Sequence, residues 1–488
     1  MTDDSSRTVE EKLPDKKEKM SEWFNRVLLE AEIVDIRYGV KGFIVYMPYG
    51  MSIMKKIIKL YERELEDTGH KPILFPVVIP ESNLRKEAEH IKGFEGEVFW
   101  ITHAGYTRLE EKLVLRPTSE TAIYPLYSLW ISSYKDLPLK AYQTVAVYRY
   151  ETKATRPLIR GREFLWIETH DVFRTAEEAL RQTIEDKEIF HKITFEELGI
   201  PFIHVRREDF DKFPGAEHTY AFDTLLPDGR VLQIGTTHYL GQKFSRVFEI
   251  KFHDIDGEYR YGEQTCFGIG LSRILASLIL THGDNFGLVL PPQVAPVQIV
   301  IIPIPKTGFD RERLLSYIQE VETILLNHGY RVESDLTEKT PGEKYYQYDL
   351  LGVPVRIEIG PREVESNTLS VFRRDTRTRE TIKLDAITTY VARLLDDIKE
   401  NLKKKAREQV EMSLSNVKSI EEINNLKDKY SLFTAPFCDL EECADHIRER
   451  TGGMEVRGVL LDRRVGEGDK CIACGEEAKN IVLIAKAY

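Results

Sequence analysis

The alternation of apolar and polar residues predicts two antiparallel strands, at 141–150 and 164–168, joined by a long polar and basic loop. Both stretches are rich in Val, Tyr, Phe and Trp, which strands favour. Successive side chains of a strand point to opposite faces, so the second strand groups four of them on one face: Phe164, Trp166, Glu168 and His170. Because an unpaired buried charge is costly, a carboxylate and an imidazole among aromatic rings favour a pocket over a dry core. Taken alone, the pattern also fits a plain β-hairpin with a solvated loop.

Hydrophobic spacing ahead of this hairpin predicts two helices and a proline-rich strand. The first helix begins at Ser21, a suitable N-cap, and the second covers roughly 51–68 before Gly69 closes it. A strand-like run bounded by glycines, 39–50, separates the two helices. The stretch 71–80 has the composition of a strand, but its prolines cannot donate hydrogen bonds. It is therefore expected at a sheet edge or a subunit boundary.

A strand at 113–115 then leads into a helix that begins near Thr118 or Ser119. Thr118, Ser119 and Glu120 have the chemistry of a helix cap and a first helical turn. Capping alone would explain these residues. The alternative is that Thr118 and Glu120 face the pocket predicted above.

After a helix at 176–198, the segment 213–242 predicts two strands joined by a Pro-Asp-Gly-Arg turn. The second of these strands carries three polar residues around Gly235: Gln233, Thr236 and His238. Such a triplet is usually solvated, but a glycine beside it permits close approach of a ligand backbone or phosphate.

The stretch 261–280 predicts a strand that passes through a glycine-rich turn into a helix. Gly268 and Gly270 form the turn, and Arg273 lies in the first turns of the helix. A glycine turn that precedes a helix N-terminus favours phosphate binding. Cys266, in the strand, is expected to be a small buried apolar residue.

The pattern changes after a proline-rich boundary at 290–296. Short apolar strands alternate with helices near 311–328 and 342–351, which predicts a separate α/β domain of about 100 residues with a mixed sheet. Four arginines follow its last predicted strand: Arg373, Arg374, Arg377 and Arg379. They form either a solvated charged turn or a basic face for a polyanion.

A helix from about 386 is expected to run into a Lys-rich linker near 403–407. The last segment, which looks poor in β-structure, holds four cysteines: Cys438, Cys443, Cys471 and Cys474. Close cysteine pairs outside a disulfide framework indicate Zn²⁺ bound by thiolates, with His446 as a substitute ligand. Their distance from the other polar motifs favours a structural site. The alternative is four unrelated reduced thiols.

Composition and charge narrow the class of protein. Hydrophobic residues make up 42% of the 488 and charged residues 31%, as in ordinary soluble proteins, and no stretch approaches the roughly 20 apolar residues that span a bilayer. The polar stretch 1–20 has the features of neither a secretory signal nor a transit peptide, so we expect a mobile tail in a cytoplasmic protein. The net charge of −11 disfavours a general nucleic-acid binder but allows local basic surfaces.

Three elements in this order resemble the signature motifs of the class II aminoacyl-tRNA synthetases: the long helix and proline-rich strand with Pro76, the aromatic-Arg-x-Glu hairpin, and the glycine-rich strand-to-helix turn with Arg273. Four stretches together are similar to the prolyl-tRNA synthetases among them. They are R-P-T-S-E-T (116–121), R-E-F-L-W-I-E-T-H (162–170), G-T-T-H-Y-L-G-Q (235–242) and G-I-G-L-S-R (268–273). The resemblance extends from about residue 20 to the end. The segment between Arg149 and Arg273 is too short for the editing insertion of bacterial-type members. The C-terminal cysteines and Tyr488 resemble archaeal and eukaryotic members.

The resemblance implies an α+β fold with a class II antiparallel-sheet catalytic domain, an α/β anticodon-binding domain and a small C-terminal zinc-binding α/β domain. The expected boundaries are a mobile tail at 1–20, the catalytic domain at 21–290, the anticodon-binding domain at 297–400 and the C-terminal domain at 408–488. It also implies a homodimer formed through the proline-rich first motif. The C-terminal carboxylate of Tyr488 is expected to reach toward the active site.

The implied activity is that of a proline–tRNA ligase. L-proline reacts with ATP, accompanied by Mg²⁺ near Gln233, to give prolyl-adenylate and pyrophosphate, and proline then passes to the 3′ end of tRNA(Pro). The catalytic residues carried over by motif are Arg149, Arg160 and Arg273. The implied ATP-binding set is Arg149, Glu151, Arg160, Phe164, Gln233, Thr236 and Arg273. The implied proline-binding set is Thr118, Glu120, Arg149, Trp166, Glu168, His170, His238 and Gly270. Candidates for anticodon contacts are Lys344, Glu358, Arg362 and Arg373.

Two other interpretations stay open at this stage. One is another synthetase of the same subclass, for threonine, serine, glycine or histidine. Threonyl enzymes place a catalytic zinc in the pocket, whereas the cysteines here lie outside the catalytic motifs. The other is an inactive paralogue that only binds tRNA. Such proteins tend to lose the motif arginines, and Arg149, Arg160 and Arg273 are all present.

Overall fold

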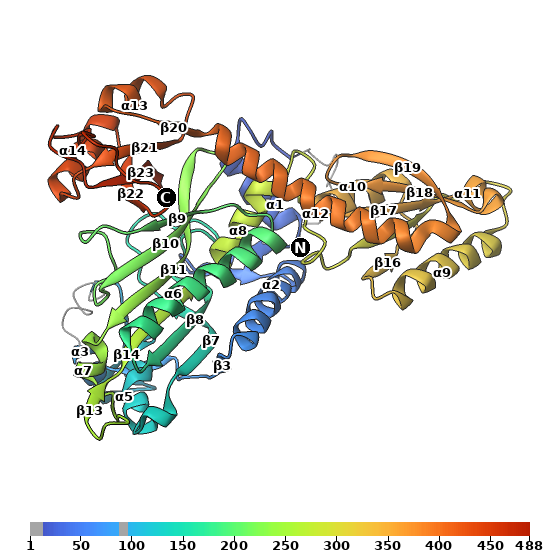
Figure 1. Ribbon diagram of the computed structural model, residues 1–488. Coiled ribbons are helices and arrows are strands. Elements are labelled where there is room, and N and C mark those ends of the chain that lie inside the picture. Colours follow the sequence, from blue (N-terminus) through green and yellow to red (C-terminus); the bar gives the residue numbers. More distant parts are fainter. Residues whose placement is uncertain (1–12, 87–95) are drawn as a thin grey trace.

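The computed structural model describes residues 13–86 and 96–488 and shows three regions (Figure 1). The largest contains the predicted hairpin. A second region, yellow and orange in Figure 1, projects to one side, and the red C-terminal region lies at the end of the main sheet. The long helix α12 (Ile387–Met412) connects the second and third regions. Within the described residues, no helix is both long and apolar enough to cross a membrane.

An 11-stranded sheet runs through the described part of the chain in the order β20-β21-β23-β22-β9-β10-β11-β14-β8-β7-β3. The hairpin prediction is confirmed, since β7 (Leu139–Tyr148) and β8 (Glu163–Phe173) pair antiparallel. β10 (His218–Leu225) and β11 (Arg230–Gly241) pair around the expected turn. β14 (Glu263–Ile269) lies between β11 and β8. The other strands are β3 (Lys71–Pro72), β9 (Ile203–Arg206), β20 (Leu414–Asn416), β21 (Leu432–Phe437), β22 (Glu455–Leu460) and β23 (Asn480–Ala487).

Helices cover one face of this sheet because most of the side chains that point to that face are apolar. Ile167 of β8 and Phe267 of β14 belong to one buried core with Trp23 and Ile57 from the covering helices. Fully burying such a side chain contributes about 2 kcal/mol. Glu168, the next residue after Ile167, points to the other face. The covering helices are α1 (Met20–Glu30), α2 (Pro48–Asp67), α6 (Ala176–Phe190) and α8 (Leu271–His282), and α6 continues in a π-helical segment, His191–Glu197.

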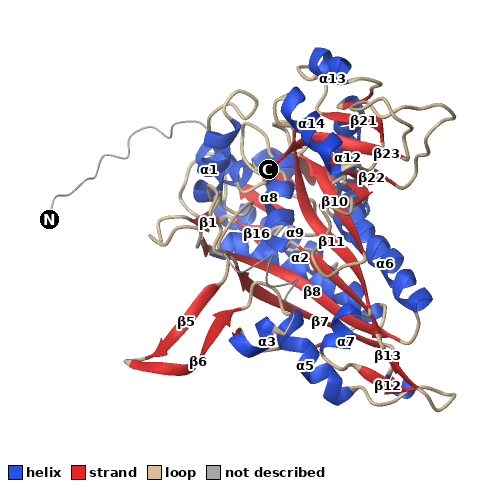
Figure 2. Ribbon diagram, turned by 90° about the vertical axis from the view of Figure 1, so that its left-hand side faces the viewer, coloured by secondary structure: helices blue, strands red, loops and turns tan. Residues whose placement is uncertain are grey.

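The proline-rich strand is confirmed as an edge. Its first part, β3, ends the main sheet beside β7. Its last part, β4 (Val78–Pro80), instead pairs with β6 (Thr107–Leu115) in a small three-stranded sheet. β6 and β5 (Phe99–Ala104) form a hairpin that projects from the body of the molecule (Figure 2). As expected, a helix follows β6, namely α5 (Glu120–Trp130).

The second region is a mixed five-stranded sheet, as predicted, in the order β16-β15-β17-β18-β19. Its first three strands are parallel, and β18 and β19 add antiparallel neighbours. The prediction that a charged turn after the strand extends to Arg379 is wrong. Arg379 lies in β19 and pairs with Phe372. The bounds are β15 (Ile299–Pro303), α9 (Arg311–Asn327), β16 (Val332–Ser334), α10 (Pro341–Leu350), β17 (Val355–Ile359), α11 (Pro361–Ser366), β18 (Thr368–Arg373) and β19 (Thr378–Lys383).

Two predictions about the C-terminal third are wrong. The Lys-rich stretch 403–407 is no linker, because α12 continues through it and Leu402 and Ala406 extend its buried stripe. Lys and Arg are good helix formers, so a basic stretch does not by itself end a helix. The C-terminal region is not poor in β-structure either, since its strands extend the main sheet through the pairing of β22 with β9.

Three expectations near the N-terminus also need correction. α1 begins at Met20 after Lys19, so Ser21 lies inside the helix and is not its N-cap. Within 39–50, only β2 (Val45–Tyr46) is a strand, and α2 begins at Pro48. Residues 13–19 pack on the largest region instead of forming a tail: Leu13 is buried, and Lys16 Nζ donates to the carbonyl of Leu280 (2.6 Å). Residues 1–12 of the predicted tail lie outside the described residues.

Candidate active site

A cavity of about 400 Å³ lies over β8, β11 and β14, next to the loop that joins β7 and β8. The structure brings together in its lining every residue that the motif match assigned to ATP or proline. They are Thr118, Glu120, Arg149, Glu151, Arg160, Phe164, Trp166, Glu168, His170, Gln233, Thr236, His238, Gly270 and Arg273. Residues as far apart in the sequence as Thr118 and Arg273 therefore line one cavity.

Backbone carbonyls hold two of the three arginines in place. Arg149, just after β7, donates from Nε to the carbonyl of Pro117 (3.0 Å), and its guanidinium lies 5.4 Å from the ring centroid of Phe164. Arg273, in the first turn of α8, donates from Nε to the carbonyl of Ile159 (3.0 Å). A carbonyl fixes the position of a guanidinium but carries no formal charge of its own.

The third arginine lies close enough to add to the same positive field. Arg160 Nε is 3.8 Å from a carboxylate oxygen of Glu151. The pKa of Arg273 falls to about 10, first because the side chain is buried and then because Arg149 and Arg160 are near. Like charges held this close favour an anion between them, and arginine suits phosphate groups because its donors form a planar fork. This part of the cavity is therefore suited to a polyphosphate.

A carboxylate and an imidazole from β8 form a second, buried cluster in the same cavity. His170 Nε2 lies 2.8 Å from Glu168 Oε2, and the hydroxyl of Tyr124 lies 3.2 Å from His170 Nδ1. Burial works to lower the pKa of His170, but the hydrogen bond and charge of Glu168 outweigh it and raise that pKa. Thr118 donates to Glu120 (2.5 Å) beside them. The cluster suits a small ligand that carries a cationic nitrogen.

Ser119 and Gln143 fix the orientation of Glu168. Ser119 is the N-cap residue of α5, but among the described residues its hydroxyl makes no capping bond and donates to Glu168 Oε1 instead. Gln143 Nε2 donates to the same oxygen (2.8 Å), and its Oε1 accepts from the backbone of Phe75 (3.0 Å). Capping therefore does not account for Ser119. Gln143 was missed, although it is a polar residue in an otherwise apolar strand face.

The polar triplet of β11, namely Gln233, Thr236 and His238, lines the cavity. This agrees with a ligand-binding role for the triplet and not with a solvated strand face. His238 Nε2 lies 3.0 Å from Thr236 Oγ1, and its Nδ1 lies 2.9 Å from Thr219 Oγ1. Burial lowers the pKa of His238 to about 4, so its imidazole is neutral near pH 7. A neutral imidazole offers one donor and one acceptor.

Gly235, beside this triplet, also lines the cavity, and its predicted closeness to a ligand stays a prediction. A Cβ atom on Gly235 would lie 2.7 Å from the ring of Phe190 on α6, so Gly235 permits close packing of helix and sheet. Gly268 is the glycine that shapes the cavity, because a Cβ atom there would lie 3.2 Å from the ring of Trp166. Gly270 is the N-cap residue of α8 and also lines the cavity. Cys266 is buried, as expected, and lines the cavity too.

Arg207 is a cavity residue that sequence reasoning missed. It follows β9 and lines the hollow, with its side chain almost fully buried. Its Nη2 donates to Gln233 Oε1 (2.8 Å) and to Asp223 Oδ1 (2.9 Å). Arg207 belongs to an ordinary charged stretch, V-R-R-E-D (205–209), and no local pattern distinguishes it. Only its tertiary contacts show that it belongs to the site.

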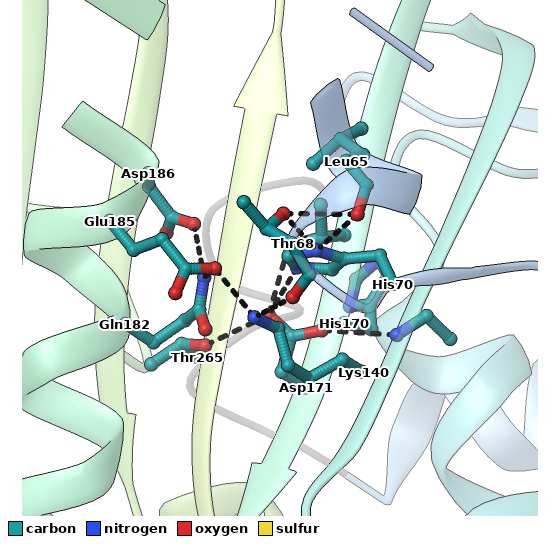
Figure 3. Close-up of polar contacts among 12 residues, drawn as sticks. Leu65, Thr68, His70, Lys140, His170, Asp171, Gln182, Glu185, Asp186 and Thr265 are labelled. Carbon is teal, nitrogen blue, oxygen red and sulfur yellow. Dashed lines mark hydrogen bonds and ion pairs between the residues drawn. The ribbon is translucent and has the colours of Figure 1, made fainter. Parts of the chain in front are cut away.

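A second buried polar cluster lies on the reverse face of β8, behind His170 (Figure 3). His70 Nε2, just after α2, lies 3.5 Å from Asp171 Oδ2. Asp186, on α6, accepts from Gln182 Nε2 (2.8 Å). His70, Asp171 and Asp186 are all fully buried. Burial, followed by the charge of Asp171, raises the pKa of Asp186 to about 7.

The four candidates for anticodon contacts have different environments. Lys344 is buried, with Nζ 3.4 Å from a carboxylate oxygen of Asp335. Glu358 is buried and accepts from two neighbouring arginines. Arg373 pairs with the carboxylate two residues further along the chain. Arg362, on α11, is exposed. Of these four side chains, Arg362 is the most available to a ligand.

The four C-terminal cysteines gather at one point, as their spacing suggested. Their Sγ atoms all lie within 4.8 Å of one another, although β22 and most of α14 (Glu441–Thr451), which carries Cys443, lie between the two pairs in the sequence. His446 does not belong to this group in the described structure. Four sulfur ligands at this spacing match the chemistry of a tetrahedral Zn²⁺ site.

Tyr488 contacts the active-site loop and does not line the cavity in the described structure. Its backbone N–H donates to the carbonyl of Val231 (3.1 Å), and its hydroxyl accepts from Arg156 Nη1 (2.8 Å). Arg156 lies in the loop that also carries Arg160. The hydroxyl of Tyr488 thus contacts this loop, whereas the expected approach of its C-terminal carboxylate to the active site stays a prediction.

Three family models match the chain and together span most of it. The "tRNA synthetase class II core domain (G, H, P, S and T)" matches residues 99–282. The "Anticodon binding domain" matches 298–394, and "Prolyl-tRNA synthetase, C-terminal" matches 420–488. The three matches follow the three regions of the fold.

Full-length relatives and solved structures show the same similarity. The proline–tRNA ligase of Thermofilum pendens is 51% identical over 97% of this chain and 98% of its own length. That of Methanopyrus kandleri is 49% identical over 96% of each chain. The structure of Giardia lamblia prolyl-tRNA synthetase in complex with prolyl-adenylate has a TM-score of 0.94 and 39% identity, covering 98% of this chain and 100% of the other. Prolyl-tRNA synthetase from Cryptosporidium parvum, complexed with halofuginone and AMPPNP, also has a TM-score of 0.94, with 31% identity over 100% and 99% of the two chains.

Proposed function

The chain belongs to the prolyl-tRNA synthetase family and is a proline–tRNA ligase, and from this premise we propose that its reaction takes place in the cavity between Arg149, Arg160 and Arg273. The observation that supports this proposal most directly is that these arginines and the Glu168–His170 pair line the same hollow. One part of the cavity suits a triphosphate and another suits a small cationic ligand. The two substrates would then meet without a large movement of the chain.

The nucleotide binds among the arginines. Arg149 contacts the α-phosphate, Arg160 holds the β- and γ-phosphates, and Arg273 contacts the γ-phosphate or stacks on adenine. Adenine lies against the ring of Phe164, on the β8 side of the cavity. Glu151 accepts from the adenine amino group. Gln233 and Thr236 contact the ribose and the phosphates.

Proline binds beside the Glu168–His170 pair. Its imino nitrogen is cationic and needs a carboxylate, which Glu120 supplies together with the hydroxyl of Thr118. The carboxylate of proline pairs with Arg149, which also contacts the α-phosphate. The remaining wall of the proline pocket is formed by Trp166, Glu168, His170, His238 and Gly270.

Positioning and charge stabilisation supply most of the catalysis. A carboxylate oxygen of proline attacks the α-phosphorus, the bond to the bridging oxygen breaks, and pyrophosphate leaves. A hydroxyl of the terminal adenosine of the tRNA then attacks the prolyl carbonyl carbon, and AMP leaves. Arg149 lies next to both reacting groups in this arrangement, so its charge offsets the negative charge that develops at the α-phosphate.

ATP is expected to enter with Mg²⁺, which would supply additional positive charge to the phosphates. We place the ion near Gln233. The amide oxygen of Gln233 already accepts from Arg207 (2.8 Å), so we expect phosphate oxygens and water to be the main ligands of the ion. The amide nitrogen of Gln233 is then the end that remains for the nucleotide.

Replacing Arg149 with Ala should reduce ATP–pyrophosphate exchange by about a hundredfold to a thousandfold. The substitution removes the guanidinium that joins the two substrates, and losing one preorganised donor typically costs a factor of 10² to 10³. Exchange is measured with labelled pyrophosphate and saturating proline. Arg246→Ala, which removes an exposed arginine of the same region, is the control and should keep its activity. Near-normal exchange in Arg149→Ala would remove this residue from the proposed site.

The same assay with a panel of amino acids separates the competing interpretations. We expect exchange to depend on proline, with threonine, serine, glycine and histidine inactive. An inactive tRNA-binding paralogue would show no exchange with any amino acid. Binding to tRNA without exchange would favour that alternative.

The C-terminal cysteines would hold a structural Zn²⁺ ion. Cys438, Cys443, Cys471 and Cys474 offer four thiolates at the required spacing, which leaves no open position for a substrate. The ion would cross-link β21, α14 and the loop before β23. No catalytic step depends on it.

We assign residues 297–400 to the binding of the tRNA anticodon, with the catalytic domain at 21–290 and the C-terminal domain at 408–488. The family match at 298–394 supports the first of these assignments. Arg362 is exposed and is the best placed of the four candidates to contact a base. Lys344, Glu358 and Arg373 would support the binding surface through their ion pairs.

We also propose a homodimer in the cytoplasm. Apolar side chains are exposed beside the edge strand β3, including Leu74, Leu129 and Trp130. An exposed sheet edge with apolar neighbours is a typical interface. Mass measurement in solution tests the dimer, and a monomer at micromolar concentration would contradict it.

A further inference from the structure

We propose that Arg457, in the C-terminal region, is a positioning residue for nucleotide binding, because it holds Gln233 in place through Asp223 and Arg207. The inference rests on the proposed contact between Gln233 and ATP. It adds that the geometry of the active site depends on a side chain from the C-terminal region, although Arg457 does not itself line the cavity in the described structure.

Asp223 is the centre of this network. It lies in β10, is fully buried, and accepts from two arginines. Arg207 Nη2 lies 2.9 Å from Oδ1, and Arg457 Nε lies 3.1 Å from Oδ2. Burial works to raise the pKa of Asp223, but the two arginines outweigh it and hold that pKa below its usual value. Asp223 is therefore ionised and depends on both partners for its charge balance.

Arg207 connects Asp223 to Gln233, which lines the cavity. The nitrogen that binds Asp223 also donates to Gln233 Oε1 (2.8 Å). Guanidinium groups only donate hydrogen bonds, so this contact requires the amide oxygen of Gln233 to face Arg207. The amide nitrogen is then directed away from Arg207. A different position of Arg207 would allow the amide to rotate.

A local irregularity in β22 brings Arg457 to this place. β22 has a bulge at Arg457, between Val456 and Gly458. Gly458 has φ +131°, and a Cβ atom there would lie 2.5 Å from the carbonyl of Arg206, so only glycine allows this close approach. Bulges re-aim side chains and often occur beside active sites. Here the bulge also lets the backbone carbonyl of Arg457 accept from Arg207.

The strand that carries Arg457 belongs to the same core as the cysteine cluster. Val456 and Val459 of β22 pack with Cys438, Cys443 and Cys471. The position of β22 therefore depends on the folding of the C-terminal region, whereas its partner β9 belongs to the catalytic region. Arg457 connects the two through a buried ion pair.

Removing the charge of Arg457 should act on the nucleotide and not on proline. Asp223 would keep one cation, Arg207, whose Nη2 already lies 2.9 Å from Oδ1 and 3.2 Å from Oδ2. Without Arg457, Oδ2 would draw this nitrogen closer. The shared nitrogen would then leave Gln233, whose amide could rotate. The Glu168–His170 cluster has no contact with this network among the described residues, so proline binding should stay unchanged.

The test uses the full-length variant Arg457→Met, which keeps the length of the side chain. We expect the KM for ATP in the exchange assay and the Kd for a non-hydrolysable ATP analogue, measured by calorimetry, to rise about tenfold. The KM for proline should stay within twofold. Arg448→Met is the matched control, because Arg448 pairs with Asp445 at the surface of the same region, and both constants should remain unchanged.

A merely structural role for Arg457 would change the two substrates alike. Equal increases in the ATP and proline constants, or an unchanged Kd for the analogue in a folded Arg457→Met protein, would overturn the proposal. If Arg457→Met does not fold, Arg457→Lys keeps the charge but loses the geometry of the contact and should show a smaller increase for ATP alone. A second check is a double-mutant cycle with Asp223→Asn, in which the effects on the analogue should be non-additive.

Gln233→Ala separates this inference from the proposed function on which it rests. If Gln233→Ala leaves ATP binding unchanged, the assignment of Gln233 to the nucleotide fails. If Gln233→Ala weakens ATP binding and Arg457→Met does not, the assignment stands and the positioning role of Arg457 fails. If both variants weaken ATP binding and spare proline, both statements hold.

Discussion

Ser119 shows how far the role of a single residue depends on its neighbours. Its place before α5 suggested a helix cap, yet its hydroxyl donates to Glu168 and so supports the cluster proposed to bind proline. Gln143 donates to the same carboxylate from the adjacent strand. A hydrogen bond to a charged group contributes about 1.5–3 kcal/mol, enough to decide how Glu168 is oriented.

Ser119→Ala should therefore raise the KM for proline about tenfold, because Glu168 loses one of the donors that fix it. The KM for ATP should change little. Proline-dependent and ATP-dependent exchange kinetics measure the two values separately. A proline KM that stays within twofold would contradict the role given to Ser119.

Ser133 provides a matched comparison, because it is a true capping residue. Its side chain accepts from the backbone of Lys135 in a reciprocal cap with Asp136. Ser133→Ala should lower the free energy of unfolding by about 1 kcal/mol and leave the proline KM unchanged. Thermal unfolding and exchange kinetics on both serine variants distinguish capping from substrate positioning.

At the scale of elements, β8 carries two polar clusters on opposite faces. Period-2 alternation sends Glu168 and His170 into the cavity and Asp171 into the buried cluster behind it (Figure 3). The same alternation made the hairpin predictable. The continuation of α12 and the presence of β19 were missed, because their charged residues resemble a linker and a turn until the neighbouring helix and strand are in place.

The buried polar cluster behind β8, formed by His70, Asp171 and Asp186, predicts that the stability of the protein depends on pH. The folded pKa of Asp186 is about 7, above its ordinary value of 3.8. Between these two values the native state keeps a proton that the unfolded chain has released. The contribution of Asp186 to stability is therefore full below pH 3.8 and is lost as the pH rises to 7, by about 1.4 kcal/mol per pH unit.

Asp186→Asn imitates the protonated carboxyl and removes this loss. The difference in unfolding temperature between the variant and the parent should widen from pH 4.5 to 7 and then stay constant. Thermal unfolding at a series of pH values measures it. Asp445→Asn, at an exposed ion pair, is the control and should show no such widening. A constant difference for Asp186→Asn at all pH values would refute the raised pKa.

At the scale of the whole molecule, one sheet joins the catalytic and C-terminal regions. β22 pairs with β9, and β23 also pairs with β11 through Arg230 and Val231. The C-terminal region is thus attached by backbone hydrogen bonds as well as by α12. Substitutions that disrupt the core of the C-terminal region should therefore also destabilise the sheet that carries the active site.

Cys474→Ser tests this connection together with the metal site. The variant should lose bound zinc and unfold at a lower temperature, since one of four thiolate ligands is removed. Metal analysis and thermal unfolding measure the two effects. Cys266→Ser, at the cysteine outside the cluster, should keep its zinc content. Full zinc content in Cys474→Ser, or a parent protein without zinc, would contradict the assignment.

The sequence by itself determined the strands and helices with a clear period, the order of the three regions, and the motif residues from Thr118 to Arg273 that share the cavity. The strands and helices are local features, because spacing along the chain decides which face a side chain occupies, whereas the motif residues followed from the resemblance to a known family. Only the tertiary structure decided that Ser119 and Gln143 orient Glu168, that Gly235 serves packing, and that Arg457 meets Asp223. Such contacts join residues 25 to more than 200 positions apart, and their chemistry depends on burial and on partners that no single stretch of sequence contains.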